Sequence, residues 1–310
     1  MDSIGITDPL WLTTFPHRVA PRPEEWLAGV ILRCDEANCW NSGTTITHLM
    51  RTAGTDADLE QMNLVLPTSS LPLALLAGWL AVPESALISS TYQFELARLY
   101  DVPHPHTQLL DMGFSLHVCP LCLDEAQMLR RSLVLPHIRC CPIHHAYLQS
   151  SCPCGRSLWR RLFSSQTQPF TCHKCGLAWA KFARQEADPK RVALEQNILT
   201  WYSFFFSKGS RMLLARALQL IGRTMEERKI TTVKHLNGRS LRVTFSSPEK
   251  TTLARLVDVL VSLKLSPEDL EADESPLLWR PLNWQTFYCP IPTCPYTRPD
   301  EAGTRREVVK

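Results

Sequence analysis

The sequence lacks the short motifs that mark several common catalytic sites. It has only 12 glycines in 310 residues, and it contains no G-x-x-x-x-G-K-[ST] phosphate loop, no G-x-S-x-G elbow and no H-E-x-x-H metal motif. Its longest apolar run, Leu71 to Val82, is too short to span a bilayer. An apolar content of 45% is nevertheless typical of a folded globular chain. We therefore expect a globular protein without a nucleotide cradle or a membrane-spanning helix.

Acidic side chains are absent from one long segment of the chain. Residues 126–185 hold nine Arg or Lys and no Asp or Glu, whereas residues 1–118 hold thirteen acidic and five basic side chains. Residues 208–242 carry nine more basic side chains against two acidic ones. A field of one sign favours a polyanion, so nucleic acid is the first partner to consider for the basic segments. An ordinary solvated basic face is the alternative, and the acidic N-terminal part favours contact with another protein.

Cysteine and histidine gather in the middle of the chain. Eight of them fall in pairs within the fifty-seven residues from 119 to 175. One set has 18 residues between its pairs and the other has 17. Two such pairs supply the four donors of a tetrahedral zinc site and leave no open position for a catalytic water. The predicted ligands of two structural zinc ions are Cys119, Cys122, Cys141 and His144 for the first, and Cys152, Cys154, Cys172 and Cys175 for the second.

Two questions about these cysteines stay open at this point. The twelve cysteines of the chain could form disulfides, but the chain begins without a basic and then apolar signal segment, so we expect a reducing, cytoplasmic location. In the first set, Cys140 neighbours Cys141 and His145 neighbours His144. The compact Cys-Pro-x-His turn favours Cys141 with His144.

A further pair of cysteines, Cys289 and Cys294, lies near the C-terminus. It makes half of a metal site, and no Cys or His follows it. We expect these thiols to be reduced or to use a spare histidine, and residues 296–310 to lack fixed structure. On this interpretation we expect the chain to be a shortened form whose downstream ligands are missing.

Helix signals occur on both sides of the cysteine-rich segment. The stretch Pro21 to Glu25 should open a helix that runs to about Asn38, because prolines precede it and acids occupy its first turn. A short helix is expected over residues 45–50. Residues 71–87 form an apolar helix, a turn and a second helix, which resemble a helix-turn-helix pair.

The C-terminal part is also expected to be mainly helical. Residues 192–206 should form a helix whose aromatic residues lie in the core, and residues 210–225 a basic amphipathic helix. One strand is predicted over residues 241–245 and a further helix over 248–263. An acidic stretch and an aromatic tail follow.

Four motifs together resemble the TniQ/TnsD family of bacterial transposition proteins, over about residues 15–180. They are Pro21-x-Pro23-x-Glu25-x-Leu27 followed by Arg33, Leu76-Ala77-Gly78-x(4)-Pro83-Glu84-x(2)-Leu87, Cys-Pro-x-Cys-Leu at 119–123 and Cys-Pro-x-His at 141–144. The resemblance implies a non-enzymatic target-site adaptor that joins a target-recognition element to an AAA+ regulator. That element is attachment-site DNA in some members and an RNA-guided CRISPR effector in others. It also implies that the eight ligands above are the family's zinc positions.

The prediction is therefore a mainly α protein in four parts. Residues 1–118 form an N-terminal helical, helix-turn-helix-like domain, 119–185 a tandem zinc-finger module, 186–280 a C-terminal helical domain and 281–310 a partly disordered aromatic tail. The expected partners are the AAA+ regulator and target DNA or an effector complex, with a homodimer possible. The predicted nucleic-acid contacts are Arg156, Arg160, Arg161, Lys174, Arg211 and Arg216, and the predicted partner contacts are Trp11, Glu24, Glu25 and Trp26.

Two other functions compete with the adaptor. A zinc-containing DNA-binding transcriptional regulator would share the same metal and charge signals. A nuclease could use His104, His106, Asp101 and Asp111, but this loose cluster lacks the convergent carboxylates and open metal positions of such enzymes. Adjacent transposase and AAA+ genes would favour the adaptor.

Overall fold

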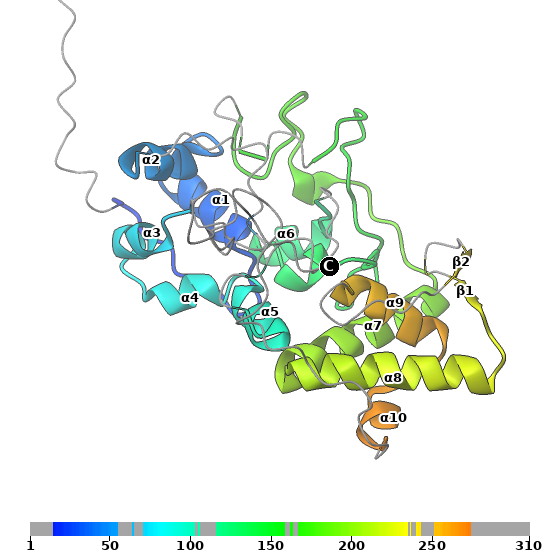
Figure 1. Cartoon of the computed structure of the whole chain (residues 1–310). Coiled ribbons are helices and arrows are strands. Elements are labelled where there is room, and N and C mark those ends of the chain that lie inside the picture. The colour runs from blue at the N-terminus through cyan, green and yellow to red at the C-terminus, as the bar shows by residue number, and fades with distance from the viewer. Residues whose placement is uncertain are drawn as a thin grey trace, which may run out of the picture.

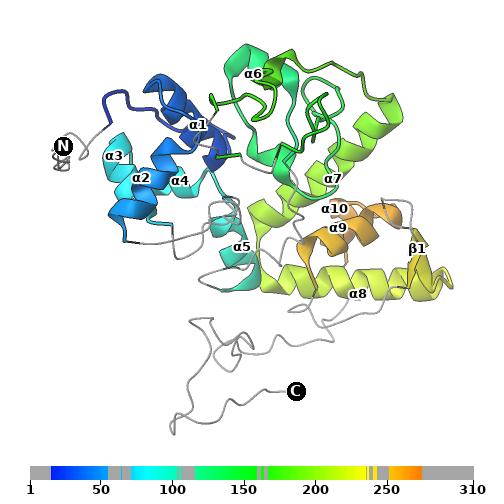
Figure 2. The same cartoon turned by 90° about the horizontal axis from the view of Figure 1, so that it is seen from above.

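The fold is mainly helical, as the sequence predicts, and its two described strands are short. We analysed a computed structural model, which describes residues 15–54, 64, 71–102, 105, 116–158, 162, 163, 167–234, 236, 240–242 and 251–273. In Figures 1 and 2 the N-terminal helices gather on one side and the C-terminal helices on the other. The segment that contains α6 lies beside both groups. Among the described residues, no helix combines the length and apolar character needed to cross a membrane.

Five helices form the N-terminal part, and four of them lie where sequence patterns place them. The Pro21 to Glu25 stretch is followed by a helix that ends before Asn38, as expected, but Glu24 and Glu25 precede this helix and do not occupy its first turn. The pair over residues 71–87 is present, and Ala81 turns the chain between its helices with a φ of 55°. The helices are α1 (Leu27–Ala37), α2 (Thr44–Thr52), α3 (Leu73–Leu80), α4 (Glu84–Ile88) and α5 (Gln93–Tyr100). The last of these was not predicted.

Helix α1 is covered on nearly all sides, so it is a central element and not a surface helix. All residues from Leu27 to Leu32 are buried, and Asp35 is buried as well. Burial on every side along two turns of a helix is typical of a core position. The backbone N–H of Trp26 donates to the carbonyl of Leu129 at 2.7 Å, which ties the start of α1 to the segment after α6.

The start of α2 makes a close contact with a segment far away in sequence. Gly43 has a φ of 82°, and a Cβ at this position would lie 2.7 Å from the Cβ and the carbonyl oxygen of Phe163. Only glycine meets both requirements without strain. Ser42 strengthens the contact, because its hydroxyl donates to the carbonyl of Leu162 at 2.6 Å and its N–H to that of Thr167 at 2.8 Å.

The cysteine-rich segment contains little regular structure. Its described elements are α6 (Pro120–Ala126) and two single turns, η3 (Arg131–Val134) and η4 (Trp179–Lys181). Isolated β-bridges such as Val118 to Gln149 and Thr171 to Ala178 connect the remaining loops. A segment built from turns and single bridges needs additional cross-links to hold one conformation.

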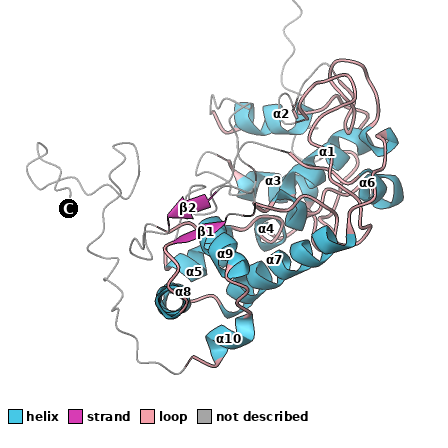
Figure 3. Ribbon diagram, turned by 90° about the vertical axis from the view of Figure 1, so that its right-hand side faces the viewer, coloured by secondary structure: helices cyan, strands magenta, loops and turns pink. Residues whose placement is uncertain are grey.

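The C-terminal part consists of long helices and one small hairpin. Its elements are α7 (Pro189–Lys208), α8 (Arg211–Glu227), β1 (Thr232–Lys234), β2 (Ser240–Arg242), α9 (Leu253–Ser262) and α10 (Pro267–Glu271). The strands are antiparallel, with Val233 opposite Leu241 (Figure 3). Trp201, Tyr202 and Phe205 of α7 are at most 1% exposed, so these aromatic residues lie in the core, as predicted.

The N-terminal and C-terminal helices share one hydrophobic core. Helix α5 packs against both α7 and α8. The ring of Tyr92 stacks on Phe206 at 4.9 Å between centroids, and the Tyr100 hydroxyl donates to the carbonyl of Thr251 at 3.1 Å. The boundaries proposed at residues 118 and 185 remain predictions, but the parts that they delimit are in direct contact.

Candidate metal centres

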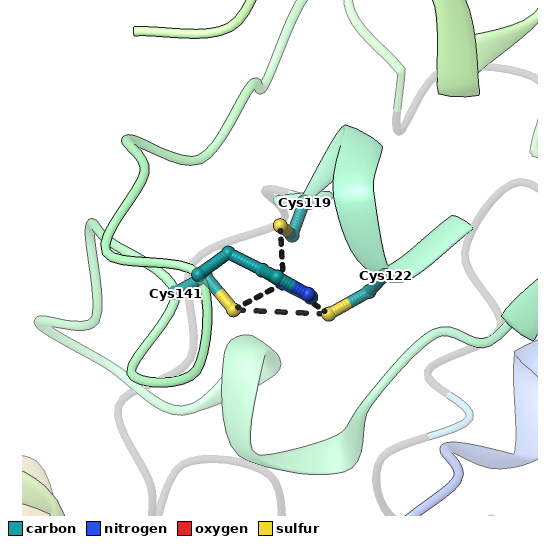
Figure 4. Close-up of side chains that lie close together, drawn as sticks. Cys119, Cys122 and Cys141 are labelled. Carbon is teal, nitrogen blue, oxygen red and sulfur yellow. Dashed lines mark hydrogen bonds between the residues drawn. The ribbon is translucent and has the colours of Figure 1, made fainter. Parts of the chain in front are cut away.

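The first cluster of ligands lies where α6 begins. Cys119 and Cys122 come from the first turn of α6, and Cys141 and His144 come from the turn beside it. Figure 4 shows the three cysteine side chains pointing toward one centre. The Nδ1 atom of His144 lies 3.4, 3.3 and 3.4 Å from the sulfurs of Cys119, Cys122 and Cys141. We call these four residues cluster one.

The geometry of cluster one fits a zinc ion. Zinc binds thiolate sulfur at about 2.3 Å and imidazole nitrogen at about 2.0 Å, so a tetrahedron separates its ligand atoms by about 3.5–3.8 Å. The sulfurs of Cys122 and Cys141 are 3.7 Å apart, and the four ligand atoms all lie within 4.8 Å of one another. Cluster one could therefore hold a metal ion.

The structure also decides between the neighbouring candidates in this set. Cys140 is fully buried but lies outside the cluster, because its backbone pairs with Tyr147 and successive side chains of an extended segment point to opposite sides. His145 is exposed and takes the left-handed conformation, with a φ of 48°. The Cys141 with His144 register that the compact turn favours is the one that the fold brings together.

A carboxylate orients the histidine of cluster one. Glu125 of α6 accepts from Nε2 of His144 at 2.9 Å, on the ring edge opposite the sulfurs. A ligand histidine in proteins commonly bonds a carboxylate through its second nitrogen, which fixes the tautomer and the ring orientation. Sequence analysis missed Glu125, although its position six residues after Cys119 on a helix could have suggested it.

A buried ion pair supports the chain just before Cys141. Glu195 of α7 is fully buried and pairs with Arg191, whose Nε donates to it at 2.6 Å. Its Oε1 also accepts from the backbone N–H of Arg139 at 2.8 Å. Burial raises the pKa of Glu195, whereas Arg191 and the backbone donor lower it. Cluster one is thus connected to α7 as well as to α1.

The second cluster joins two turns at the surface. The sulfur of Cys152 lies 3.5 Å from that of Cys175, and the sulfur of Cys154 lies 3.6 Å from that of Cys172. These separations also fit a tetrahedral zinc site, so this cluster could hold a second metal ion. Cys152 and Cys172 are buried, but Cys154 is half-buried and Cys175 is exposed. We call these four residues cluster two.

The two clusters share one turn geometry. The N–H of His145 donates to the carbonyl of Cys141 at 2.9 Å, and the N–H of Gly176 donates to the carbonyl of Cys172 at the same distance. Both donors have a positive φ. Glycine takes this conformation at little cost, whereas His145 carries a side chain in it. The turn of cluster one therefore keeps its shape despite an unfavourable residue.

One thiol in each cluster is surrounded by hydrogen-bond donors, whereas neighbouring thiols raise the pKa of Cys122 and burial raises that of Cys152. The thiols of Cys119 and Cys122, and then the N–H groups of His144 and Ile143, lower the pKa of Cys141. Burial raises the pKa of Cys172, but the N–H groups of Cys175 and Lys174 and the nearby thiols outweigh it and bring that pKa to about 7. Donors aimed at sulfur favour the thiolate, which is the form that binds metal.

The predicted nucleic-acid residues do not form one set. Arg156 and Lys174 are exposed beside cluster two, and Arg216 is exposed on α8. Arg211 is only 8% exposed at the start of α8, so it is not available to phosphate and we do not retain it. Arg160 and Arg161 lie outside the described residues.

The predicted partner contacts also differ in their exposure to solvent. Glu24 is exposed, and its carboxylate lies 3.7 Å from the guanidinium of Arg131. Glu25 has a side chain that is 0% exposed and accepts from Arg33 at 2.5 and 2.7 Å, so it is a core ion pair. Trp26 is 1% exposed and belongs to the core. Trp11 lies outside the described residues.

Several other predictions concern residues that the structure does not describe. They are the Cys289 and Cys294 pair, the tail over 296–310, and His104, His106 and Asp111 of the nuclease hypothesis.

Fold and sites together define a mainly helical protein with two four-ligand Cys/His clusters, each able to hold a metal ion. Residues 16–148 match the model of the TniQ family. This segment is a TniQ domain, and it supports the TniQ/TnsD family for the chain, as the four motifs predict. A TniQ domain implies a role related to DNA transposition. A search among curated proteins finds no match.

Proposed function

We propose that this protein is a target-selection adaptor in DNA transposition, without an active site of its own. The observation that carries the proposal is the TniQ match over residues 16–148, which contains all of cluster one. The adaptor would connect a target-recognition element to the AAA+ regulator of a transposon. The element is attachment-site DNA or an RNA-guided effector complex.

Two structural zinc ions belong to this proposal. Each cluster offers four protein ligands, and a zinc ion bound by four such ligands has no open position for water. When bound, zinc would supply cross-links between turns and no chemistry. Cys119 to His144 would hold the first ion and Cys152 to Cys175 the second.

The nucleic-acid contact is assigned to the exposed cations Arg156, Lys174 and Arg216. Arg156 follows the ligand Cys154, and Lys174 lies between the ligands Cys172 and Cys175. A metal bound in cluster two would therefore fix the backbone that carries both cations. Phosphate contacts release counterions, so binding through these residues should weaken as salt rises. Among the predicted protein contacts, only Glu24 is both described and exposed, and it stays assigned to the regulator.

A pull-down of tagged full-length protein with its neighbouring gene products tests the adaptor. We expect the AAA+ regulator to be retained both with and without nuclease. Retention of DNA but not of the ATPase would favour the transcriptional regulator and overturn the adaptor.

A salt titration of DNA binding tests the assignment of the cations. Reversal of Arg156, Lys174 and Arg216 to Glu should lower the slope of log affinity against log salt by about 0.9 per lost phosphate contact. Lys190→Glu, an exposed cation at the start of α7, is the matched control and should leave the slope unchanged. An unchanged slope in the triple variant would refute the assignment.

A further inference from the structure

Cluster two contains an exposed cysteine, whereas the three cysteines of cluster one are buried. Cys119, Cys122 and Cys141 are 1%, 2% and 0% exposed, whereas Cys175 is exposed and Cys154 is half-buried. Oxidation of a cysteine requires that the oxidant reach a thiolate, so access is a main determinant of which cysteine reacts. An oxidant in solution therefore meets cluster two first.

The sulfurs of cluster two are also paired across its two turns. Cys152 of the first turn lies 3.5 Å from Cys175 of the second. A disulfide has an S–S bond of about 2.0 Å, so these two sulfurs need to approach by about 1.5 Å. The exposed Cys175 thus has a buried thiol partner at contact distance, which is the arrangement of a reactive and a resolving cysteine.

We propose that Cys175 and Cys152 are a modification site for hydrogen peroxide, at which oxidation forms a disulfide and releases the metal of cluster two. The Cys175 thiolate attacks one peroxide oxygen, the O–O bond breaks, and hydroxide leaves. The resulting sulfenic acid is attacked by the Cys152 sulfur, the S–O bond breaks, and a second hydroxide leaves. The two thiolates lose two electrons to the peroxide, and two protons convert the hydroxides to water.

The consequence for the chain is local. A disulfide removes two of the four donors, and metal binding at such sites supplies the folding free energy of the surrounding turns. Around cluster two the described chain has only turns and the single bridges Ser151 to Ser157 and Thr171 to Ala178. Oxidation should therefore loosen the backbone that carries Arg156 and Lys174. Any loss of DNA binding that results rests on the proposed function, whereas the disulfide does not.

The test treats the zinc-loaded full-length protein with hydrogen peroxide. A chromogenic chelator measures zinc release, and alkylation with mass spectrometry maps the thiols. We expect one equivalent of zinc to leave at least about tenfold faster than the second, together with a Cys152 to Cys175 disulfide. Dithiothreitol and added zinc should reverse both. Equal release of the two zincs, or a first disulfide within cluster one, would overturn the proposal.

Two variants separate this site from general cysteine oxidation. Cys39→Ser removes an exposed cysteine outside both clusters and should leave the release rate unchanged. Cys175→His keeps a nitrogen donor for zinc but cannot form the disulfide, so fast release should be lost. If Cys175→His does not bind zinc, the thiol map of the wild-type protein still decides. A disulfide that forms without any change in DNA binding would refute the role of Arg156 and Lys174 and leave the modification site standing.

Discussion

Cluster one and cluster two have the same number of ligands and the same turn geometry, but they differ in how far the surrounding fold buries them. Cluster one is enclosed: Trp26 donates to Leu129 after α6, and Glu195 of α7 accepts from Arg139 just before Cys141. Cluster two touches the core through the loop between its pairs, where Ser42 bonds Leu162, while its ligand turns lie at the surface.

The family match also separates cluster one from cluster two. It ends at residue 148, after the last ligand of cluster one and before the first ligand of cluster two. A metal that joins α6 to the elements around it is part of the core, whereas a metal that joins two surface turns stabilises only those turns. The two sites should therefore differ in what their loss does to the protein.

The largest effect is expected from Cys122→Ser. From the sequence alone, replacement of either Cys122 or Cys175 by Ser is expected to unfold the middle of the protein, because metal binding at such sites is folding free energy. The enclosure of cluster one changes that expectation. Structural zinc contributes about 10–16 kcal/mol in small sites, which matches or exceeds the 5–15 kcal/mol total stability of a typical domain. Cys122→Ser should abolish cooperative unfolding and bind one zinc or none.

Cys175→Ser is the matched variant in cluster two. It should bind one zinc and keep a cooperative transition, because the core around cluster one is intact. Metal analysis and thermal unfolding by circular dichroism measure both properties. Similar behaviour of the two variants would show that burial does not set the importance of the sites.

The next effect compares a buried ion pair with an exposed one. Glu25→Ala breaks the pair with Arg33 at the start of α1, where the carboxylate is 0% exposed. Removing one partner of a buried pair costs about 3–5 kcal/mol, because the other charge is left buried. Asp124→Ala is the control, since Asp124 pairs with Lys181 and Arg184 at 42% exposure and such a pair contributes about 0–1 kcal/mol. Urea unfolding of both variants measures the difference, and equal costs would contradict it.

The third effect is a pH dependence at the α1 to α2 junction, which carries the contact to the loop of cluster two. Burial raises the pKa of Asp35 from 3.8 to about 6, although the N–H groups of Thr45 and Gly43 donate to it and lower it. The folded state then holds this proton more tightly than the unfolded chain. The contribution of Asp35 is greatest below the unfolded pKa and is lost as pH rises through about 6.

Asp35→Asn tests this dependence. A difference of about 2 pKa units corresponds to about 3 kcal/mol, so the stability of the wild-type protein relative to the variant should fall by about that amount as pH rises past both values. The wild-type protein has to be compared with the variant at each pH, because the metal ligands also bind protons in this pH range. Their effect on stability is the same in both proteins and cancels in the difference. A constant difference between pH 4.5 and 7 would contradict the raised pKa.

Much of the fold could be predicted from the sequence, for local reasons. Apolar periodicity and end signals placed α1, α2, α3, α4, α7, α8 and α9, because those signals act within a few residues. Helix α5 was missed, because few end signals mark the short stretch from Gln93 to Tyr100 and it is stabilised by packing against α7 and α8. The strand pairing of β1 was missed for a similar reason, since it depends on a partner strand.

The candidate sites could be predicted only where spacing decides the chemistry. The short spacing within each Cys/His pair is visible in the sequence, so all eight members of the two clusters could be predicted from it. Burial of a charged residue depends on its distant neighbours. Glu25 is predicted from the sequence to contact a partner, but its carboxylate is paired with Arg33 in the core. The fold also buries Arg211 and Trp26, which the sequence alone does not show.

The smallest effect distinguishes the clusters by their ligand type. Only cluster one contains a histidine, and Glu125 holds that ring by accepting from its Nε2 at 2.9 Å. Loss of such an outer carboxylate typically lowers metal affinity by about 10- to 100-fold, because the ring is less well oriented and less basic. Glu125→Gln should therefore weaken zinc binding at one of two sites, which competition with a chromogenic chelator resolves as one shifted and one unchanged transition. Asp124→Asn, on the preceding residue, is the control and should leave both transitions in place. If Glu125→Gln shifts neither transition, the carboxylate is an exposed partner of His144 without influence on the metal, and the two clusters differ only in burial.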